Sequence, residues 1–215
     1  MTYLQLVNDV LVRLREEQVS TVTETTYSSL IGKFVNDAKR AIEDSYEWNV
    51  LGTNVVVSTT SGTSSYALTG AGQKFRIQDV INTTSKLGLT NIPFANMNRY
   101  LNFGNSTNSI PLYFSFDGVD ASYDTKVSLF PIPDGVYSLK FSLIVPQASL
   151  SSDSTECLMP SELVTQNAYA RALVERGEDG GLSSSEAYQL YKSMLSDYVA
   201  MEATRYPEFS SFEAV

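Results

Sequence analysis

The residues that could carry out chemistry in this chain are carboxylates, hydroxyls and one cysteine, because the 215 residues include no histidine. Histidine is the usual general base near neutral pH and the commonest metal ligand, so its absence excludes Ser-His-Asp and Cys-His catalysis and most transition-metal sites. Cys157 alone can form neither an internal disulfide nor a zinc cluster. A reactive thiolate needs an electropositive setting, whereas Cys157 follows Glu156, so we expect no chemical role for it.

Two short patterns could bind a ligand, and both are incomplete. Asp117, Asp120 and Asp124 could hold calcium through carboxylate oxygens, but the loop lacks the other ligands and the closing glutamate of a calcium-binding loop. TGAGQK, residues 69–74, lacks the full glycine pattern and the Lys-Ser/Thr pair of a phosphate-binding loop. The sequence therefore predicts no enzyme, no metal site and no cofactor.

The C-terminal stretch RYPEFSSFEAV is a better candidate for a functional segment. Tyr206, Phe209 and Phe212 recur at three-residue spacing, and Pro207 ends any preceding helix. Aromatic anchors dominate many protein interfaces, and this segment is too apolar for a free tail. We interpret it as a segment that docks on another protein; folding back on its own subunit remains the alternative.

A helical hairpin is predicted at the N-terminus. Thr2 and Gln5 form a capping-box pattern, and apolar residues at helical spacing extend the first helix to about Glu17. A second apolar stripe spans residues 27–46, and so short a link between two helices favours antiparallel packing. Trp48, the only tryptophan, is expected to fill the core where this helix gives way to β structure.

A second helical hairpin is predicted at the other end of the chain. One helix begins at Pro160 and ends where Gly177 should adopt the left-handed cap conformation. The next begins with a second capping-box pattern, Ser183 with Glu186, and its apolar stripe continues to Met201.

The residues between these hairpins have the composition of β structure. Val127–Phe130 and Val136–Val145 carry apolar residues at alternate positions, and the PIPDG segment between them predicts a hairpin connection. Short strands separated by Gly, Pro and Asn favour a small antiparallel sandwich or barrel. The other candidate elements are strands at Asn54–Thr59, Ser64–Leu68, Arg76–Asn82 and Leu112–Asp117 and a short helix at Pro93–Phe103.

The expected fold class is α+β: a four-helix bundle formed by the N- and C-terminal helices, with an inserted small antiparallel β-sandwich or barrel domain. The expected boundaries are a helical hairpin at 1–49, the β domain at 50–150, a helical hairpin at 151–204 and an extended tail at 205–215.

Charge is distributed unevenly along the chain, whose net charge is −9. Residues 1–49 carry 5 basic and 8 acidic side chains, residues 50–149 carry 6 and 5, and residues 150–215 carry 4 and 11. Binding nucleic-acid phosphates requires clustered Lys and Arg, so the acidic helical ends suit a surface along which DNA passes without being held. No apolar run approaches the roughly 18 residues of a membrane span, and no membrane partner is expected.

Several stretches resemble phage proteins. Val7–Leu11, the acidic Glu16, Val19–Thr21 and a second helix that ends at Trp48 resemble the head-to-tail adaptor of short-tailed phages, the tail tubular protein A family. The segments LFPIPDGVYSLKF, LMPSEL and ARALVERGEDGG are also similar to phage adaptor-type virion proteins.

This resemblance implies a structural virion protein at the neck of the phage, assembled in the host cytoplasm. Members of that family form a homo-oligomeric ring, usually a dodecamer, between the portal protein and the tail nozzle protein. DNA passes through the central channel without specific binding. Because the family's C-terminal segment reaches the portal, the resemblance makes Tyr206, Pro207, Phe209 and Phe212 the candidate portal-binding residues.

Two alternatives remain open. The chain could be another tail-completion or baseplate component, which would share the helices and the sheet but not the portal contact. It could also be a glycan-binding or hydrolytic tail module that uses the β domain. The aromatic platform for such a module would come from Tyr100, Phe103, Tyr113 and Tyr123, beside Asp117 and Asp120.

Overall fold

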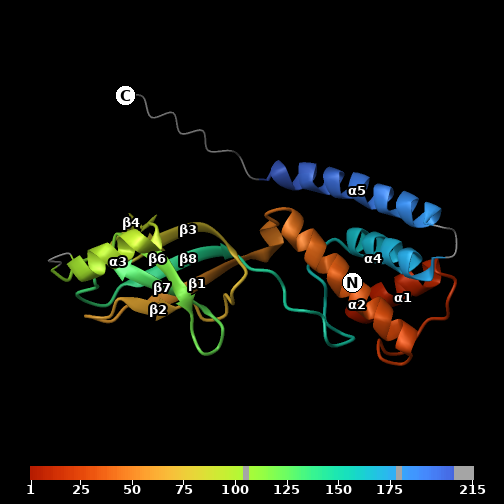
Figure 1. Ribbon diagram of the computed structural model, residues 1–215, viewed down its shortest axis with the longest axis horizontal. Coiled ribbons are helices and arrows are strands. Elements are labelled where there is room, and N and C mark those ends of the chain that lie inside the picture. Colours follow the sequence, from red (N-terminus) through yellow and green to blue (C-terminus); the bar gives the residue numbers. More distant parts are fainter. Residues whose placement is uncertain (104–106, 178–180, 206–215) are drawn as a thin grey trace. The chain divides into compact units, whose positions relative to one another are not determined.

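The computed structural model describes residues 1–103, 107–177 and 181–205 (Figure 1). The chain divides into two compact units. The helical unit comprises Met1–Val50 and the described residues from Gln147 onward, and the β unit comprises Leu51–Pro146. Each unit encloses its own set of buried apolar side chains.

The helices of the helical unit begin and end mostly where local sequence signals place them. They are α1 (Tyr3–Arg13), α2 (Thr26–Ser45), α4 (Ser161–Arg176) and α5 (Leu182–Ala203). The predicted capping box at the start of α1 is confirmed, since the Thr2 and Gln5 side chains each accept a hydrogen bond from the other's backbone N–H. Gly177 ends α4 at φ 61°, in the predicted left-handed conformation.

Helices α1, α2 and α4 pack against one another around an apolar core. Gly32 allows the close approach of α1 to α2, because a Cβ at that position would lie 2.8 Å from Val22 Cγ1 and would also collide with the Tyr3 hydroxyl. The fully buried residues of this core include Leu6, Val7, Val10, Ile31, Val35, Ala38, Ile42, Leu163, Val164 and Ala168.

The predicted four-helix bundle is wrong, because α5 packs mainly on α4 instead of completing a shared core. Large apolar side chains of α5 point into solvent, with Leu190 53% and Met201 56% exposed. The predicted capping box at the start of α5 is also wrong. Gly181 is the N-cap residue, so Ser183 lies inside the helix instead of at its cap.

The described part of the β unit contains two four-stranded sheets. Its elements are β1 (Gly52–Ser58), β2 (Ser65–Ala67), β3 (Arg76–Asn82), β4 (Leu87–Gly88), β5 (Thr90–Asn91), α3 (Phe94–Phe103), β6 (Tyr113–Val119), β7 (Thr125–Phe130) and β8 (Ser138–Ile144). The strand orders are β1-β8-β3-β4 and β2-β7-β6-β5. The strand pairs are antiparallel, except that β5 runs parallel to β6.

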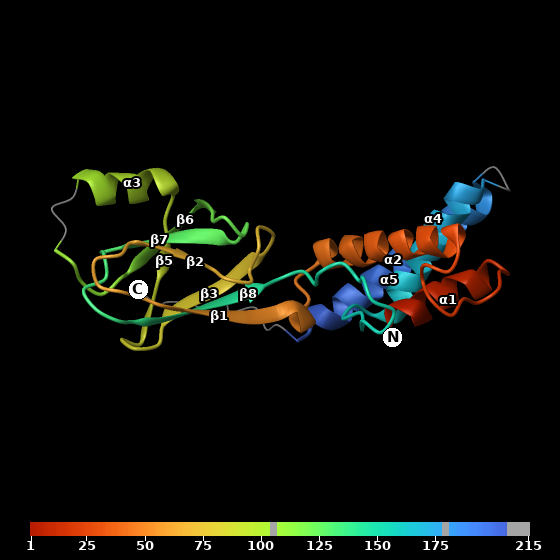
Figure 2. The ribbon, with the colours of Figure 1, turned by 90° about the horizontal axis from the view of Figure 1, so that it is seen from below.

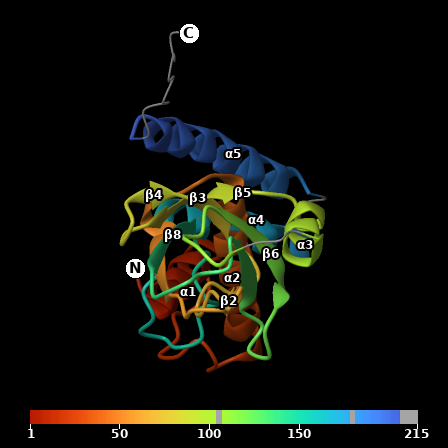
Figure 3. The same ribbon diagram turned by 90° about the vertical axis from the view of Figure 1, so that its left-hand side faces the viewer.

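The two sheets face each other across one core, which confirms a β-sandwich. Figure 2 shows the sheet of β6 and β7 as one layer, the sheet of β1, β8 and β3 as the next, and α3 outside the first layer. In Figure 3, α3 again lies beside β6, on the side away from β8. Both sheets supply the core, whose buried residues include Val57, Leu68, Val80, Phe114, Val127, Leu129, Leu139, Phe141 and Leu143.

The connection between β7 and β8 differs from the predicted hairpin. β7 pairs with β2 and β6, whereas β8 pairs with β1 and β3, so residues 131–137 cross from one sheet to the other. The alternating apolar residues of both strands face the same core from opposite layers, which is why their sequences look like two halves of one hairpin. Gly135 is not among the residues with positive φ, so no left-handed turn is formed there.

Candidate functional site

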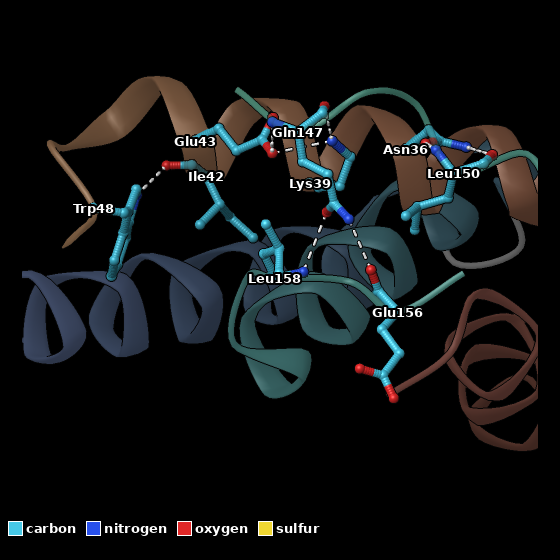
Figure 4. A network of polar contacts seen from close by, with 9 residues as sticks. All are labelled: Asn36, Lys39, Ile42, Glu43, Trp48, Gln147, Leu150, Glu156 and Leu158. Atoms are coloured by element: carbon cyan, nitrogen blue, oxygen red, sulfur yellow. Dashed lines mark hydrogen bonds and ion pairs between the residues drawn. The ribbon is translucent and has the colours of Figure 1, made fainter. Parts of the chain in front are cut away.

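Three polar side chains of α2, Asn36, Lys39 and Glu43, bind the main chain of the segment that follows β8 (Figure 4). We call these three residues the clamp. Lys39 and Glu43 are 2% and 5% exposed, and Lys39 Nζ lies 3.0 Å from Glu43 Oε1. Lys39 Nζ also donates to the Gln147 carbonyl at 2.6 Å, and the Gln147 N–H donates to Glu43 Oε1 at 3.1 Å. Burying a charge pair carries a large desolvation penalty unless both side chains are fully hydrogen-bonded. The contacts to Gln147 supply those hydrogen bonds.

The clamp extends along the segment that follows Gln147. Asn36 accepts a hydrogen bond from the Leu150 N–H at 2.7 Å and donates to the Leu150 carbonyl at 3.1 Å. The Gln147 side chain donates to the Glu156 carbonyl at 2.7 Å and accepts from the Leu158 N–H at 3.1 Å. The α2 side chains thus hold the main chain at Gln147 and Leu150, and the Gln147 side chain in turn holds the main chain at Glu156 and Leu158.

The same segment also binds the N-terminus. The Tyr3 N–H donates to the Thr155 carbonyl at 2.9 Å, and the Cys157 N–H donates to the Met1 carbonyl at 3.0 Å. The Asp153 carboxylate accepts from the Val22 N–H at 3.1 Å. The helices from the two ends of the sequence are thus joined by backbone hydrogen bonds as well as by apolar packing.

Sequence reasoning missed this clamp, although a signal was present. Lys39 and Glu43 stand four residues apart on the buried face of α2, which also carries the apolar residues Val35, Ala38 and Ile42. An ion pair on the apolar side of a helix predicts a buried polar partner, because such groups are rarely buried unpaired.

The core role predicted for Trp48 is confirmed: it is 3% exposed, and its Nε1 donates to the Ile42 carbonyl at 2.7 Å.

In the described part of the helical unit, helix α5 carries several large exposed apolar side chains: Leu182, Tyr188, Leu190 and Met201. Its N-terminal half and α4 line an open cleft of about 280 Å³, whose walls are Asn167, Ala170, Arg171, Val174, Ser184 and Tyr188. Leu182 and Val174 are each 68% exposed.

Polar contacts fix α5 in place on its inner side. Gln166 of α4 donates to the Ala187 carbonyl at 3.1 Å, and the Tyr198 hydroxyl donates to Glu162 at 3.0 Å, which raises the pKa of Tyr198. Glu202, near the end of α5, is only 7% exposed and accepts from the Asn49 N–H at 2.8 Å. The exposed apolar side chains are therefore carried by a helix that is anchored along its length.

The candidate portal-binding residues Tyr206, Pro207, Phe209 and Phe212 lie outside the described residues.

Cys157 is buried, and burial raises the pKa of its thiol, which disfavours the reactive thiolate.

The aspartates considered for calcium make hydrogen bonds within the β unit. Asp117 accepts from Ser128 Oγ, Asp120 from the Ser122 and Asp124 backbone N–H groups, and Asp124 from those of Gly70 and Gly72. Within residues 1–103, 107–177 and 181–205, no cluster of three or more cysteine or carboxylate side chains is arranged to hold a metal.

The aromatic platform of the glycan-binding alternative is only partly assembled. Tyr100 of α3 stacks on Phe130 with ring centroids 5.0 Å apart and lies 6.3 Å from Tyr113. Phe103 and Tyr123 are 86% and 71% exposed, and in the described part of the chain neither ring joins that stack. Two of the four predicted residues are therefore brought together.

No helix in the described ranges is long and apolar enough to cross a membrane. The helical unit carries exposed apolar side chains on an anchored helix and, on α2, a clamp of buried polar side chains. The family comparison defines the class: a bacteriophage adaptor, a structural component of the virion. Residues 1–211 match the family described as SU10 adaptor protein, and the chain belongs to that family.

The match supports the phage-adaptor resemblance seen in the sequence, but it does not confirm the tail tubular protein A family. A comparison with curated proteins gives no match.

Proposed function

We propose that this protein is a head-to-tail adaptor that forms a ring of twelve copies between the portal protein and the tail nozzle protein. DNA passes through the centre of the ring. The protein acts by geometry, as a coupler of two virion parts, and catalyses no reaction.

The observation that carries the proposal is the family match, which spans residues 1–211 and so covers both units. The exposed apolar side chains of α5 support it, because each copy in a ring buries one surface against a different surface of the next. Such a head-to-tail contact closes into a ring when its rotation closes. Leu182, Leu190 and Met201 are suitable residues for one side of that contact.

The charge distribution supports passage of DNA without binding. Residues 1–49 and 150–215 together carry 9 basic and 19 acidic side chains. A lumen lined by such a surface repels phosphates, and few Lys or Arg side chains are present to release counterions from DNA. The helical unit is therefore the part that we assign to the channel wall.

The portal contact is assigned to the C-terminal residues Tyr206, Pro207, Phe209 and Phe212. Two features of the sequence support this assignment. Aromatic residues recur at three-residue spacing after α5, and no Lys or Arg follows Arg205 in this sequence. Aromatic anchors that enter pockets account for much of the affinity of many protein interfaces.

Mass photometry of the protein mixed with its cognate portal ring tests the proposal. We expect a complex whose added mass corresponds to a ring of copies, together with loss of that complex when Phe209 and Phe212 are both changed to Ser. A Leu112→Ser variant, altered at a partly exposed side chain of the β unit, is the matched control and should bind normally. Normal binding by the double variant would remove the tail from the portal contact, and no complex with the unaltered protein would contradict the adaptor role.

A further inference from the structure

In the described part of the β unit, one sheet edge is long and lacks the usual protecting features. β1 is the terminal strand of its sheet and spans seven residues, whereas the other terminal strands β4, β5 and β2 span two, two and three. Proteins usually protect such edges with charges, prolines or bulges, because an open edge is a template for another strand. The β1 sequence GTNVVVS contains no charged residue and no proline, and its pairing with β8 is regular.

The register of β1 shows which backbone groups point toward the open side. The Val145 N–H donates to the Leu51 carbonyl, and the Thr59 N–H donates to the Tyr137 carbonyl, at the two ends of the strand. Hydrogen-bonded pairs alternate in an antiparallel ladder, so Thr53, Val55 and Val57 bond to β8. The N–H and carbonyl groups of the intervening residues, Asn54, Val56 and Ser58, therefore face the open edge.

A cleft lies beside this edge. Its volume is about 370 Å³, and it is lined by residues 53–57 of β1 and by Ala67, Thr69 and Gly70 at and after β2. Val56 is 59% exposed. The side chains that line the cleft are uncharged, but the register places Lys140 opposite Val56 and Lys126 opposite Ala67. Among the described residues, the edge thus combines main-chain groups that β8 leaves unbonded, a hollow of mixed polar and apolar lining, and nearby positive charge.

We propose that this edge binds the C-terminal segment, residues 206–215, of a second copy of the chain as an added β-strand. Strand addition obtains its affinity from main-chain hydrogen bonds and its selectivity from pockets that accept alternate side chains. The eight residues after Pro207 all carry N–H groups and include Phe209 and Phe212, either of which can fill the cleft. Glu208 and Glu213 are the charged residues of the segment, which complements the neighbouring lysines.

The two surfaces satisfy the requirements of a head-to-tail contact. The segment and the β1 edge are different surfaces of one chain, so each copy can donate one and accept the other. Ten residues can extend over about 33 Å, which gives the segment reach beyond its own helix. This inference rests on the proposed ring only because the ring places a second copy nearby. The portal then competes with the β1 edge for the same aromatic residues and releases the segment when it binds them.

Residue-resolved amide hydrogen exchange on the full-length protein tests this binding without a portal. We expect the amides of Asn54, Val56 and Ser58 to exchange on the order of tenfold more slowly than in a Phe209→Ser/Phe212→Ser variant. The amides of Thr53, Val55 and Val57 are an internal control, because β8 protects them in both proteins. The difference should shrink on dilution, since the contact joins two copies.

A Val56→Pro variant provides a second test. It removes an N–H that points outward, and proline is tolerated where the lost N–H faces away from the sheet, so the β1–β8 ladder stays intact. We expect this variant to lose concentration-dependent self-association in sedimentation. Equal exchange of the outward amides in both proteins, protection that does not change on dilution, or self-association of Val56→Pro as in the unaltered protein would each overturn the proposal. Failure here leaves portal binding untouched, because neither measurement includes a portal.

Discussion

Replacing Lys39 by alanine tests whether the α2 clamp stabilises the helical unit. The change removes the 3.0 Å ion pair with Glu43 and the 2.6 Å hydrogen bond to the Gln147 carbonyl. Glu43 remains, with a side chain only 1% exposed and the Gln147 N–H as its remaining donor in the clamp. Removing one member of a buried ion pair lowers the free energy of unfolding by about 3–5 kcal/mol. Because Glu43 keeps one hydrogen bond, we expect a loss near the lower end, about 3 kcal/mol.

Trp48 is the reporter for the measurement. It is the only tryptophan, belongs to the helical unit and is 3% exposed, so its fluorescence follows unfolding of that unit in urea. A Lys39→Met/Glu43→Leu variant should be destabilised less than Lys39→Ala, because no unpaired charge remains and the cost is that of the unbonded Gln147 groups, about 1–3 kcal/mol.

Asp9→Ala is the matched control. Asp9 and Arg13 form an ion pair with the same four-residue spacing, but their side chains are 38% and 36% exposed. Exposed pairs contribute at most about 1 kcal/mol. Destabilisation of Lys39→Ala no greater than that of Asp9→Ala would show that the buried clamp contributes no more than an exposed ion pair.

Three further predictions concern the helical unit. Gly32→Ala should destabilise it by about 1–3 kcal/mol in urea, because the added methyl collides with Tyr3 and Val22; unchanged stability would contradict the close packing. Gly177→Ala should cost about 1 kcal/mol, because φ is 61° there, and a thermal midpoint at or above that of the unaltered protein would argue against this strain. Burial raises the pKa of Tyr191 above its ordinary value of 10.0, so the folded state keeps a proton that the unfolded chain loses. The stabilisation from the protonated Tyr191 hydroxyl is complete below pH 10 and is lost as the pH rises above that value. Tyr191→Phe should therefore flatten the fall in the free energy of unfolding at alkaline pH. An unchanged slope would contradict the assignment.

Local signals predicted much of the fold. The Thr2 capping box and the left-handed Gly177 mark ends of α1 and α4, because capping depends on a few adjacent residues. The candidate strand Arg76–Asn82 coincides with β3, and alternation of apolar residues identified β7 and β8. Features set by neighbours along the chain were therefore accessible from the sequence.

Features set by distant partners were not. PIPDG is compatible with a turn, but β8 pairs with β1 and β3, and this choice between sheets depends on residues more than fifty positions away. The apolar residues of α5 suggested a core helix, yet Leu190 and Met201 are exposed, since periodicity does not distinguish an internal partner from an external one. The open edge of β1 likewise becomes visible only once the strand order is known.

We propose that copies of this chain form a ring that stacks on the portal. Electron microscopy of the purified protein mixed with its cognate portal ring, beside a variant that ends at Arg205, tests it most directly. We expect a second ring with a central channel on the portal, and its loss in the shortened variant. Portal rings that remain bare in the presence of the full-length protein would contradict it.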